Sequence, residues 1–303
     1  MPGVMTGVPF EFPSLPGMTE RPRWTGRAFR VGGAERRILA YEIGATGWSE
    51  ELTRLHEQSA AERHFIDVAS RAYALETIRR HITARQPAIL EIGCSSGYLL
   101  RELAAAFPEA LVMGADHTLA SLEALAERLP AVPLLRFDAT RCPLPDAALD
   151  VVVMLNVLEH IERDDLALAH AARILKPGGV LVLEVPAGPR LYGGYDRQLM
   201  HCRRYDMAGL ERLTAAAGLR TRAKSHLGFL LYPAFWLAKT LTRSAAPGAA
   251  SKAGSTVARS IALTGRVNRL GYGLMGLEGR LRRVLPMPFG IRCLLCGVKP
   301  SAS

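Results

Sequence analysis

Hydrophobic residues in the middle of the chain follow two different periods, one typical of strands and one typical of helices. Short apolar runs predict five strands, at residues 88–92, 111–115, 133–137, 149–155 and 180–185. Elsewhere hydrophobic residues recur every three or four positions, which predicts helices at residues 96–107, 118–129, 163–175 and 207–217. This alternation predicts an α/β fold with a mostly parallel sheet and helices on both faces.

The same pattern divides the chain into a core and several attachments. Two further segments, 219–225 and 291–298, are predicted as a sixth and a seventh strand, which gives a seven-stranded sheet. We expect a disordered leader at residues 1–33, because this part is rich in proline and has no hydrophobic period. The other predicted boundaries are a helical extension at 34–84 with one helix at 48–82, a core at 85–227, a basic amphipathic helical insertion at 228–288, and a last strand with a tail at 289–303.

Composition narrows the class of protein. Hydrophobic residues make up 49% of the 303 residues, which allows a sizeable core and excludes a largely disordered chain. The leader lacks the basic start and apolar stretch of a secretory signal, so we expect the five cysteines to be reduced thiols in a cytoplasm. Cys293 and Cys296 have no second ligand pair nearby and would face opposite sides of a strand, which predicts two core thiols and not a zinc site.

Positive charge is concentrated towards the C-terminal end. The net charge is +10, and from Arg220 onward fourteen Lys and Arg residues face one acid, Glu278, which gives +13 and leaves −3 for the rest. The apolar run at 227–238 is shorter than the roughly twenty residues of a bilayer span. Its aromatic residues with basic neighbours suit the headgroup layer of an anionic membrane. The alternative is that they pack on the main domain as a lid.

A glycine-containing turn follows the first predicted strand of the core. Gly93 and Gly97 allow the backbone to approach a ligand closely, and the helix that begins there suits an anionic group. Their spacing departs from the dinucleotide fingerprint G-x-G-x-x-G, which disfavours an oxidoreductase. Asp116 ends the second strand, where a carboxylate can bind ribose hydroxyls. Asp138 and the amide of Ala139 follow the third strand, where they can bind adenine, although either acid could instead cap a helix.

Taken together, these segments resemble the class I S-adenosylmethionine-dependent methyltransferase family. The run Glu91-Ile92-Gly93-Cys94-Ser95-Ser96-Gly97 is similar to the family motif E-x-G-x-G/S-x-G, with Ser95 where many members have glycine. Residues 155–160 and 175–179 match later landmarks in order. The resemblance implies a Rossmann-like fold and S-adenosyl-L-methionine as cofactor. It implies a cofactor-binding set of Glu91, Gly93, Cys94, Ser95, Gly97, Tyr98, Asp116, His117, Asp138, Ala139, Asn156 and Val157.

The segment after the fifth predicted strand is rich in side chains that could serve a methyl acceptor. It resembles a P-x-x-x-L-(W/Y)-x-x-x-D-x-x-x-x-H-x-R-R-Y signature found in a subset of small-molecule-type methyltransferases. We hypothesise that His201 is a general base or binds the acceptor, with Asp196 orienting it and Tyr192 as a pocket wall. Arg203 and Arg204 would hold an anionic group. The alternative is that these residues form only a hydrogen-bonded scaffold for a lid.

Other reaction classes lack their sequence marks. Residues 155–158 replace the (D/N)-P-P-(Y/F) motif common in amino-methylation of nucleic-acid bases, and Arg141-Cys142-Pro143 has the wrong order for a cytosine-C5 nucleophile. No H-E-x-x-H or other metal-ligand spacing occurs in the sequence, so we expect no metal. For His160, after the fourth strand, a capping or structural role is the simpler interpretation.

These observations lead us to expect a cytoplasmic methyltransferase that acts on a small-molecule or lipid-like acceptor at oxygen, by in-line displacement, with a peripheral contact to the inner membrane surface. Nucleic acid is a less favoured partner, because no binding module accompanies the charge. The alternatives are a noncatalytic S-adenosylmethionine-binding or membrane-adaptor protein and a nicotinamide dehydrogenase. The sequence leaves the acceptor, the accepting atom and the oligomeric state open.

Overall fold

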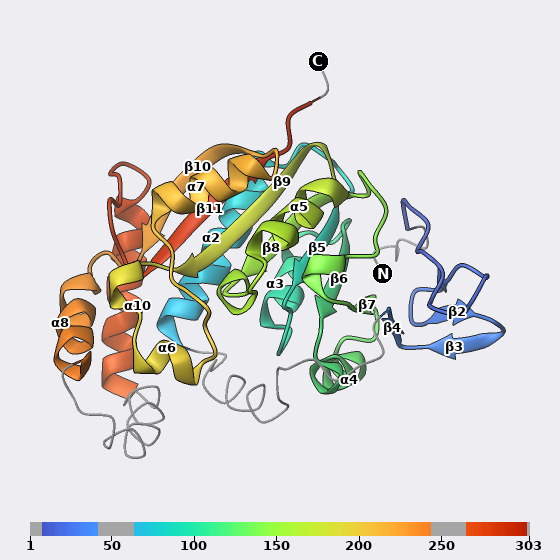
Figure 1. Ribbon diagram of the computed structural model, residues 1–303, viewed down its shortest axis with the longest axis horizontal. Coiled ribbons are helices and arrows are strands. Elements are labelled where there is room, and N and C mark those ends of the chain that lie inside the picture. Colours follow the sequence, from blue (N-terminus) through green and yellow to red (C-terminus); the bar gives the residue numbers. More distant parts are fainter. Residues whose placement is uncertain (1–7, 42–63, 244–264, 302–303) are drawn as a thin grey trace.

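A central sheet organises the computed structural model, which describes residues 8–41, 64–243 and 265–301 (Figure 1). In spatial order its strands are β10 (Arg220–Leu227), β11 (Arg292–Val298), β9 (Leu175–Pro186), β8 (Leu149–Leu155), β5 (Ala88–Ile92), β6 (Leu111–Asp116), β7 (Leu134–Arg136) and β4 (Ile38–Ala40). Neighbouring strands are parallel from β9 to β4, whereas β11 is antiparallel to both β9 and β10. The expected mostly parallel α/β fold is confirmed.

Helices cover both faces of this sheet. In chain order they are α2 (Phe65–His81), α3 (Tyr98–Ala106), α4 (Leu119–Arg128), α5 (Asp164–Ile174), α6 (Gly194–Gln198), α7 (Met207–Ala216), α8 (Tyr232–Arg243) and α10 (Gly265–Leu281), with 3-10 turns η1 (Ala139–Arg141), η2 (Leu158–His160) and η3 (Pro189–Leu191). Figure 1 shows α5 and α7 on one side of the sheet and α2 on the other. The two layers have separate cores, and successive β8 residues such as Val151 and Val152 belong to opposite ones. A strand buried on both faces explains the nearly continuous apolar run in its sequence.

The N-terminal segment differs from the disordered leader that we expected. A second, antiparallel sheet is formed by β1 (Arg23–Trp24), β2 (Phe29–Val31) and β3 (Ala34–Arg36). Phe12, Trp24 and Phe29 are buried, and the ring of Phe29 contacts both other rings. The next strand, β4, pairs with β7 and makes the central sheet one strand wider than expected. Scattered aromatic residues order this segment, which is why a search for periodicity missed it.

The two predicted helical attachments are described only in part. In the extension expected at residues 34–84, residues 34–36 and 38–40 form strands, whereas α2 is the end of the helix predicted at 48–82. The first part of that helix lies outside the described residues, as does segment 244–264 of the predicted insertion. The described parts of the insertion form α8 and α10. Among the described residues, no helix is both long and apolar enough to span a bilayer.

The two cysteines of the C-x-x-C pair lie in β11, and both are buried and unbridged. Cys293 packs in one of the two cores and Cys296 in the other, so the side chains point to opposite faces of the sheet. The expectation of two core thiols is confirmed.

Candidate active site

The carboxyl ends of four parallel strands bring the predicted cofactor residues to one edge of the sheet. β5 ends just before Gly93, β6 ends at Asp116, β7 ends two residues before Asp138, and β8 ends just before Asn156. Open α/β sheets bind ligands at this edge. We call the residues at these four strand ends, 91–98, 116–117, 138–139 and 156–157, the strand-end rim.

The first loop of the rim requires glycine at Gly93. This residue has a φ of +77°, and a Cβ built on it would lie 2.4 Å from Cγ2 of Val157. The loop is therefore pressed against the end of β8 without a side chain between them. Ser95 keeps a positive φ of 38°, and its amide donates a 3.0 Å hydrogen bond to Oδ2 of Asp116. The loop is thus fixed to the neighbouring strand end.

The two acids predicted to hold ribose and adenine also hold the rim itself. Oδ1 of Asp116 accepts a 2.9 Å hydrogen bond from the amide of Thr118, and His117 Nδ1 lies 3.5 Å from the same oxygen. Oδ1 of Asp138 accepts from both the amide and the hydroxyl of Thr140, so Asp138 caps η1, as the alternative interpretation held. A carboxylate offers about four acceptor positions, so these contacts leave room for ligand hydroxyl and amino groups.

Glu91 has the surroundings expected of a group that meets a cation. It is 6% exposed, and its Oε2 has no hydrogen-bond partner among the described residues. Burial and the neighbouring charge of Asp116 raise the pKa of Glu91 well above its ordinary value. A ligand amino group would supply the missing partner. The rim therefore fits S-adenosylmethionine, which carries an ammonium and a sulfonium, better than an anionic dinucleotide.

Some members of the predicted set turn their side chains into the protein. Cys94 is buried in the core, so its backbone is the part that can face a ligand. Asn156 has a φ of +53°, and its side-chain amide donates to Oε1 of Glu184 at 2.9 Å. The guanidinium groups of Arg71 and Arg101 lie 5.6 and 5.7 Å from the ring centroid of Tyr98. These side chains shape the rim and do not extend from it.

Sequence reasoning missed Glu184, which accepts a hydrogen bond from Asn156 of the rim. It is fully buried in β9, and Oε1 accepts hydrogen bonds from Ser70 at 2.9 Å and Arg292 at 2.7 Å, in addition to the bond from Asn156. These contacts join α2, β11 and the end of β8. The available signal was a single acid inside an otherwise apolar strand.

On the acceptor side, Asp196 is the centre of a buried charge cluster. Its side chain is fully buried, with Arg204 Nε at 2.6 Å and His201 Nδ1 at 3.2 Å from Oδ1, and Lys239 Nζ at 3.0 Å from Oδ2. Burial alone would raise the pKa of Asp196, but the His201 hydrogen bond and the charges of Arg204 and Lys239 hold it below its ordinary value. We call these four residues the Asp196 cluster. It orients His201 as the sequence predicted.

The structure does not support the predicted role of the two arginines. Arg204 also donates to the carbonyl of Ala187 at 3.1 Å, and Arg203 is paired with Asp164 at 2.5 Å. Each arginine is therefore paired with a carboxylate of the protein, Arg204 with Asp196 and Arg203 with Asp164. The hydroxyl of Tyr192 likewise donates to the carbonyl of His201 at 2.8 Å. Most contacts of this segment therefore match the scaffold alternative, and the ring of His201 is its remaining candidate for chemistry.

Lys239 was recognised in the sequence only as a basic neighbour of an apolar run. In the structure it brings α8 to the Asp196 cluster, and its Nζ also lies 4.8 Å from the ring centroid of Tyr195. Figure 1 places α8 and α6 at the same end of the molecule. At least this part of the insertion therefore packs against the main domain.

Comparisons with known proteins agree with this geometry. Residues 90–183 match a family model described as a methyltransferase domain. A probable S-adenosylmethionine-dependent methyltransferase of Mycolicibacterium smegmatis is 33% identical over 135 residues, which cover 43% of this chain and 51% of that protein. A ubiquinone/menaquinone biosynthesis C-methyltransferase of Syntrophotalea carbinolica is 32% identical over 132 residues, which cover 41% of this chain and 56% of that protein. The chain spans about half the length of the curated relatives it matches.

A solved structure extends the likeness in fold beyond the matched segment. A S-adenosylmethionine-dependent methyltransferase from Thermotoga maritima aligns with a TM-score of 0.52 at 16% identity, covering 82% of this chain and 97% of that one. This structure shows a likeness in fold, and the matched segment 90–183 includes the strand-end rim. The match of residues 90–183, the similarity to named S-adenosylmethionine-dependent methyltransferases and the shared fold support the class I S-adenosylmethionine-dependent methyltransferase superfamily for this part of the chain.

Proposed function

We propose that this protein transfers a methyl group from S-adenosylmethionine to an oxygen atom of a small-molecule or lipid-like acceptor. The bound cofactor supplies an electrophilic methyl group on a sulfonium, a leaving group that needs no acid catalyst. The protein's contribution is then to align the acceptor, exclude water and remove the acceptor's proton. One observation carries the proposal. The buried carboxylate of Asp196 orients His201, and the ring of His201 contacts His160 of η2, the turn that directly follows the strand-end rim.

The rim residues would hold the cofactor. Glu91 would bind its amino group, because a buried carboxylate oxygen there lacks a partner among the described residues. Asp116 would accept hydrogen bonds from the ribose hydroxyls. Asp138 and the amide of Ala139 would bind the adenine edge.

His201 would hold or move the acceptor's proton. Because Asp196 remains ionised, it accepts a hydrogen bond from Nδ1–H, which leaves Nε2 unprotonated and able to face a ligand. Nε2 could then accept the proton of an acceptor hydroxyl as the oxygen–methyl bond forms. The choice of oxygen rests on this base. The relative named as a C-methyltransferase supports a lipid-like acceptor, but its name points to a different accepting atom.

Methyl-labelled S-adenosylmethionine tests the proposal directly. The protein is incubated with fractionated lipid and small-molecule extracts, and labelled products are identified. We expect a labelled O-methyl product that is lost in Asp116→Ala and reduced in His201→Gln. Binding of S-adenosylhomocysteine without transfer to any fraction would instead favour a noncatalytic binding protein. Full turnover by His201→Ala on the identified acceptor would remove the role of His201.

We also propose that the α8–α10 region contacts an anionic membrane surface. Of the ten large hydrophobic side chains that are exposed in the described residues, eight lie between Trp236 and Phe289. The same part of the chain carries nine Lys and Arg residues and one acid, so apolar and electrostatic attraction would act together. Sedimentation with anionic vesicles at low salt is expected to capture the protein, and Trp236→Ser with Leu237→Ser to weaken capture. Equal recovery with neutral vesicles, or none with anionic ones, would contradict it.

A further inference from the structure

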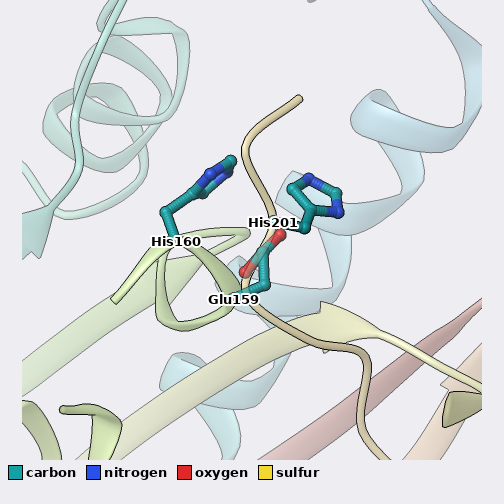
Figure 2. A group of neighbouring side chains, drawn as sticks. All are labelled: Glu159, His160 and His201. Carbon is teal, nitrogen blue, oxygen red and sulfur yellow. The ribbon is translucent and has the colours of Figure 1, made fainter. Parts of the chain in front are cut away.

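A cluster of three metal-ligand side chains lies next to the strand-end rim. Glu159, His160 and His201 each offer one ligand atom, and these three atoms lie within 4.8 Å of one another. Figure 2 shows the Glu159 carboxylate directed towards the two imidazole rings, with Glu159 and His160 on η2 and His201 on the segment that follows α6. Ligand atoms around a bound zinc ion lie roughly 3–4 Å apart, so a small side-chain rotation would complete the set.

The carboxylate in this cluster is buried without full compensation. Glu159 is 1% exposed, and its Oε2 has no hydrogen-bond partner among the described residues. Leaving a carboxylate oxygen in this state costs free energy, unless a cation or a donor is added. A metal ion between Glu159 and the imidazole rings would supply that compensation.

The backbone holds the two halves of the cluster together although they are distant in sequence. The amide of Cys202 donates to the carbonyl of Glu159 at 2.6 Å. The rings of His160 and His201 are in edge-to-face contact, with centroids 4.7 Å apart. The Tyr192 hydroxyl fixes the carbonyl of His201. The ligand set is therefore preorganised by contacts that do not involve the ligand atoms themselves.

The surroundings of His201 are those of a metal-binding histidine. Its Nδ1 lies 3.2 Å from the buried carboxylate of Asp196, which fixes the ring and leaves Nε2 as the atom that can bind a metal. Carboxylate–histidine pairs of this kind orient metal ligands and strengthen them. Asp196 is itself held by Arg204 and Lys239, so its position does not depend on the metal.

From this geometry we propose that Glu159, His160 and His201 bind one divalent first-row transition metal ion. Two imidazole nitrogens and one carboxylate oxygen suit Zn²⁺ and its neighbours, whereas Mg²⁺ and Ca²⁺ prefer oxygen ligands. Three protein ligands leave a coordination position open. No local metal-ligand spacing marks this site in the sequence, because its ligands come from two segments about forty residues apart.

The open position gives the site a role in the reaction proposed above, and this role rests on that proposal. An acceptor hydroxyl bound to the metal would ionise more readily, with its proton passing to water. Its oxygen would then attack the methyl carbon, and the electron pair of the broken carbon–sulfur bond would remain on sulfur. In this arrangement Nε2 of His201 binds the metal, so the metal-bound hydroxyl loses its proton to water and not to His201, and the O-methyl transfer proposed above is otherwise unchanged.

Metal binding can be tested without cofactor or acceptor. The full chain, free of any metal-binding tag and stripped with a chelator, is titrated with Zn²⁺ in a calorimeter, and the visible spectrum is recorded with Co²⁺. We expect one equivalent to bind, no comparable heat from Mg²⁺, and a loss of affinity of at least about 100-fold in Glu159→Gln and His160→Gln. Glu162→Gln is the matched control, since Glu162 is an exposed carboxyl three positions along, and it should bind like wild type.

The opposite results are equally specific. Absence of stoichiometric Zn²⁺ binding, or wild-type affinity in Glu159→Gln, would overturn the site. Loss of binding in Cys202→Ser alone would place the metal on that exposed thiol and also overturn it. Circular dichroism and S-adenosylhomocysteine titration confirm that each variant is folded. Failure of the metal site leaves that titration intact, whereas failure of the proposed function appears as metal binding without methyl transfer.

Discussion

The strand-end rim and the Asp196 cluster are neighbours in the site, but they are ordered by different physical means. The rim depends on backbone conformation: Gly93 has a positive φ, and its backbone presses against Val157 with no side chain between. The Asp196 cluster depends on charge, since one buried carboxylate compensates Arg204 and Lys239 from separate elements. The strand-end rim should therefore tolerate little added side-chain volume, whereas the Asp196 cluster should tolerate little change in charge. Each can therefore be broken by a substitution that the other would tolerate.

The largest expected effect is on the charge cluster. Asp196→Asn leaves two buried cations without their counter-charge, so we expect a loss of about 3–5 kcal/mol in the free energy of unfolding. Chemical denaturation measures it. Asp165→Asn is the control, because Asp165 forms an exposed ion pair with Arg163 and its loss should change little. Similar stabilities for Asp196→Asn and the control would show that the cluster does not hold this region together.

The next effect is on the rim. Gly93→Ala places a Cβ against Val157 and forces the loop to move, so we expect at least about 100-fold weaker binding of S-adenosylhomocysteine, or about 2.7 kcal/mol. Gly178→Ala is the matched control. Gly178 has a φ of +78° but nothing within 4 Å of an added Cβ, so it carries the backbone strain without the clash. Equal affinities in the two variants would mean that the close approach at Gly93 is unimportant for the cofactor.

A smaller loss of stability is expected from a substitution that affects the Asp196 cluster and not the strand-end rim. Lys239→Met removes one cation from the cluster while Arg204 still compensates Asp196, so we expect a loss of about 1–2 kcal/mol. Hydrogen exchange should rise in α8 and not in the rim, and S-adenosylhomocysteine affinity should stay within twofold. Lys224→Met, which breaks an exposed pair with Glu211, should leave exchange in α8 unchanged. A marked drop in cofactor affinity in Lys239→Met would show that the two regions are coupled.

The smallest effect concerns pH and lies outside both regions. Burial lowers the pKa of His226, whose Nδ1 is 2.8 Å from the carbonyl of Met287. The unfolded chain therefore takes up a proton at higher pH than the folded chain, and stability should fall as pH drops through about 6.5. His226→Gln should reduce this slope between pH 7 and 5 by less than about 1 kcal/mol in total. Burial also lowers the pKa of His64, His81 and His170, so some slope should remain. An unchanged slope would contradict the assignment to His226.

The same contrast explains which features could be read from the sequence. The position of Gly93, Asp116 and Asp138 at one edge of the sheet could be predicted, because each lies at or just after the end of an apolar strand and parallel strands end at the same edge. Lys239 and Glu184 were not recognised as site residues, since their partners are far away in sequence and no local period marks them.

The carboxylate partners of the two arginines could not be predicted for a related physical reason. A sequence shows that Arg203 and Arg204 are charged, but not that Asp164 and Asp196 lie within reach to compensate them. The ordered N-terminal sheet was missed because rings such as Phe12 and Phe29 pack across turns without any regular spacing. Charges and aromatic rings that pair across long distances in the chain cannot be matched to their partners from a single sequence.

Calorimetric titration of the intact chain with S-adenosylhomocysteine tests the central claim most directly. A strand-end rim built for the cofactor predicts one equivalent bound, at least tenfold weaker binding in Asp116→Ala, and no competition from NAD. Folded protein that gives no heat with S-adenosylhomocysteine, or an Asp116→Ala variant that binds as tightly as wild type, would contradict it.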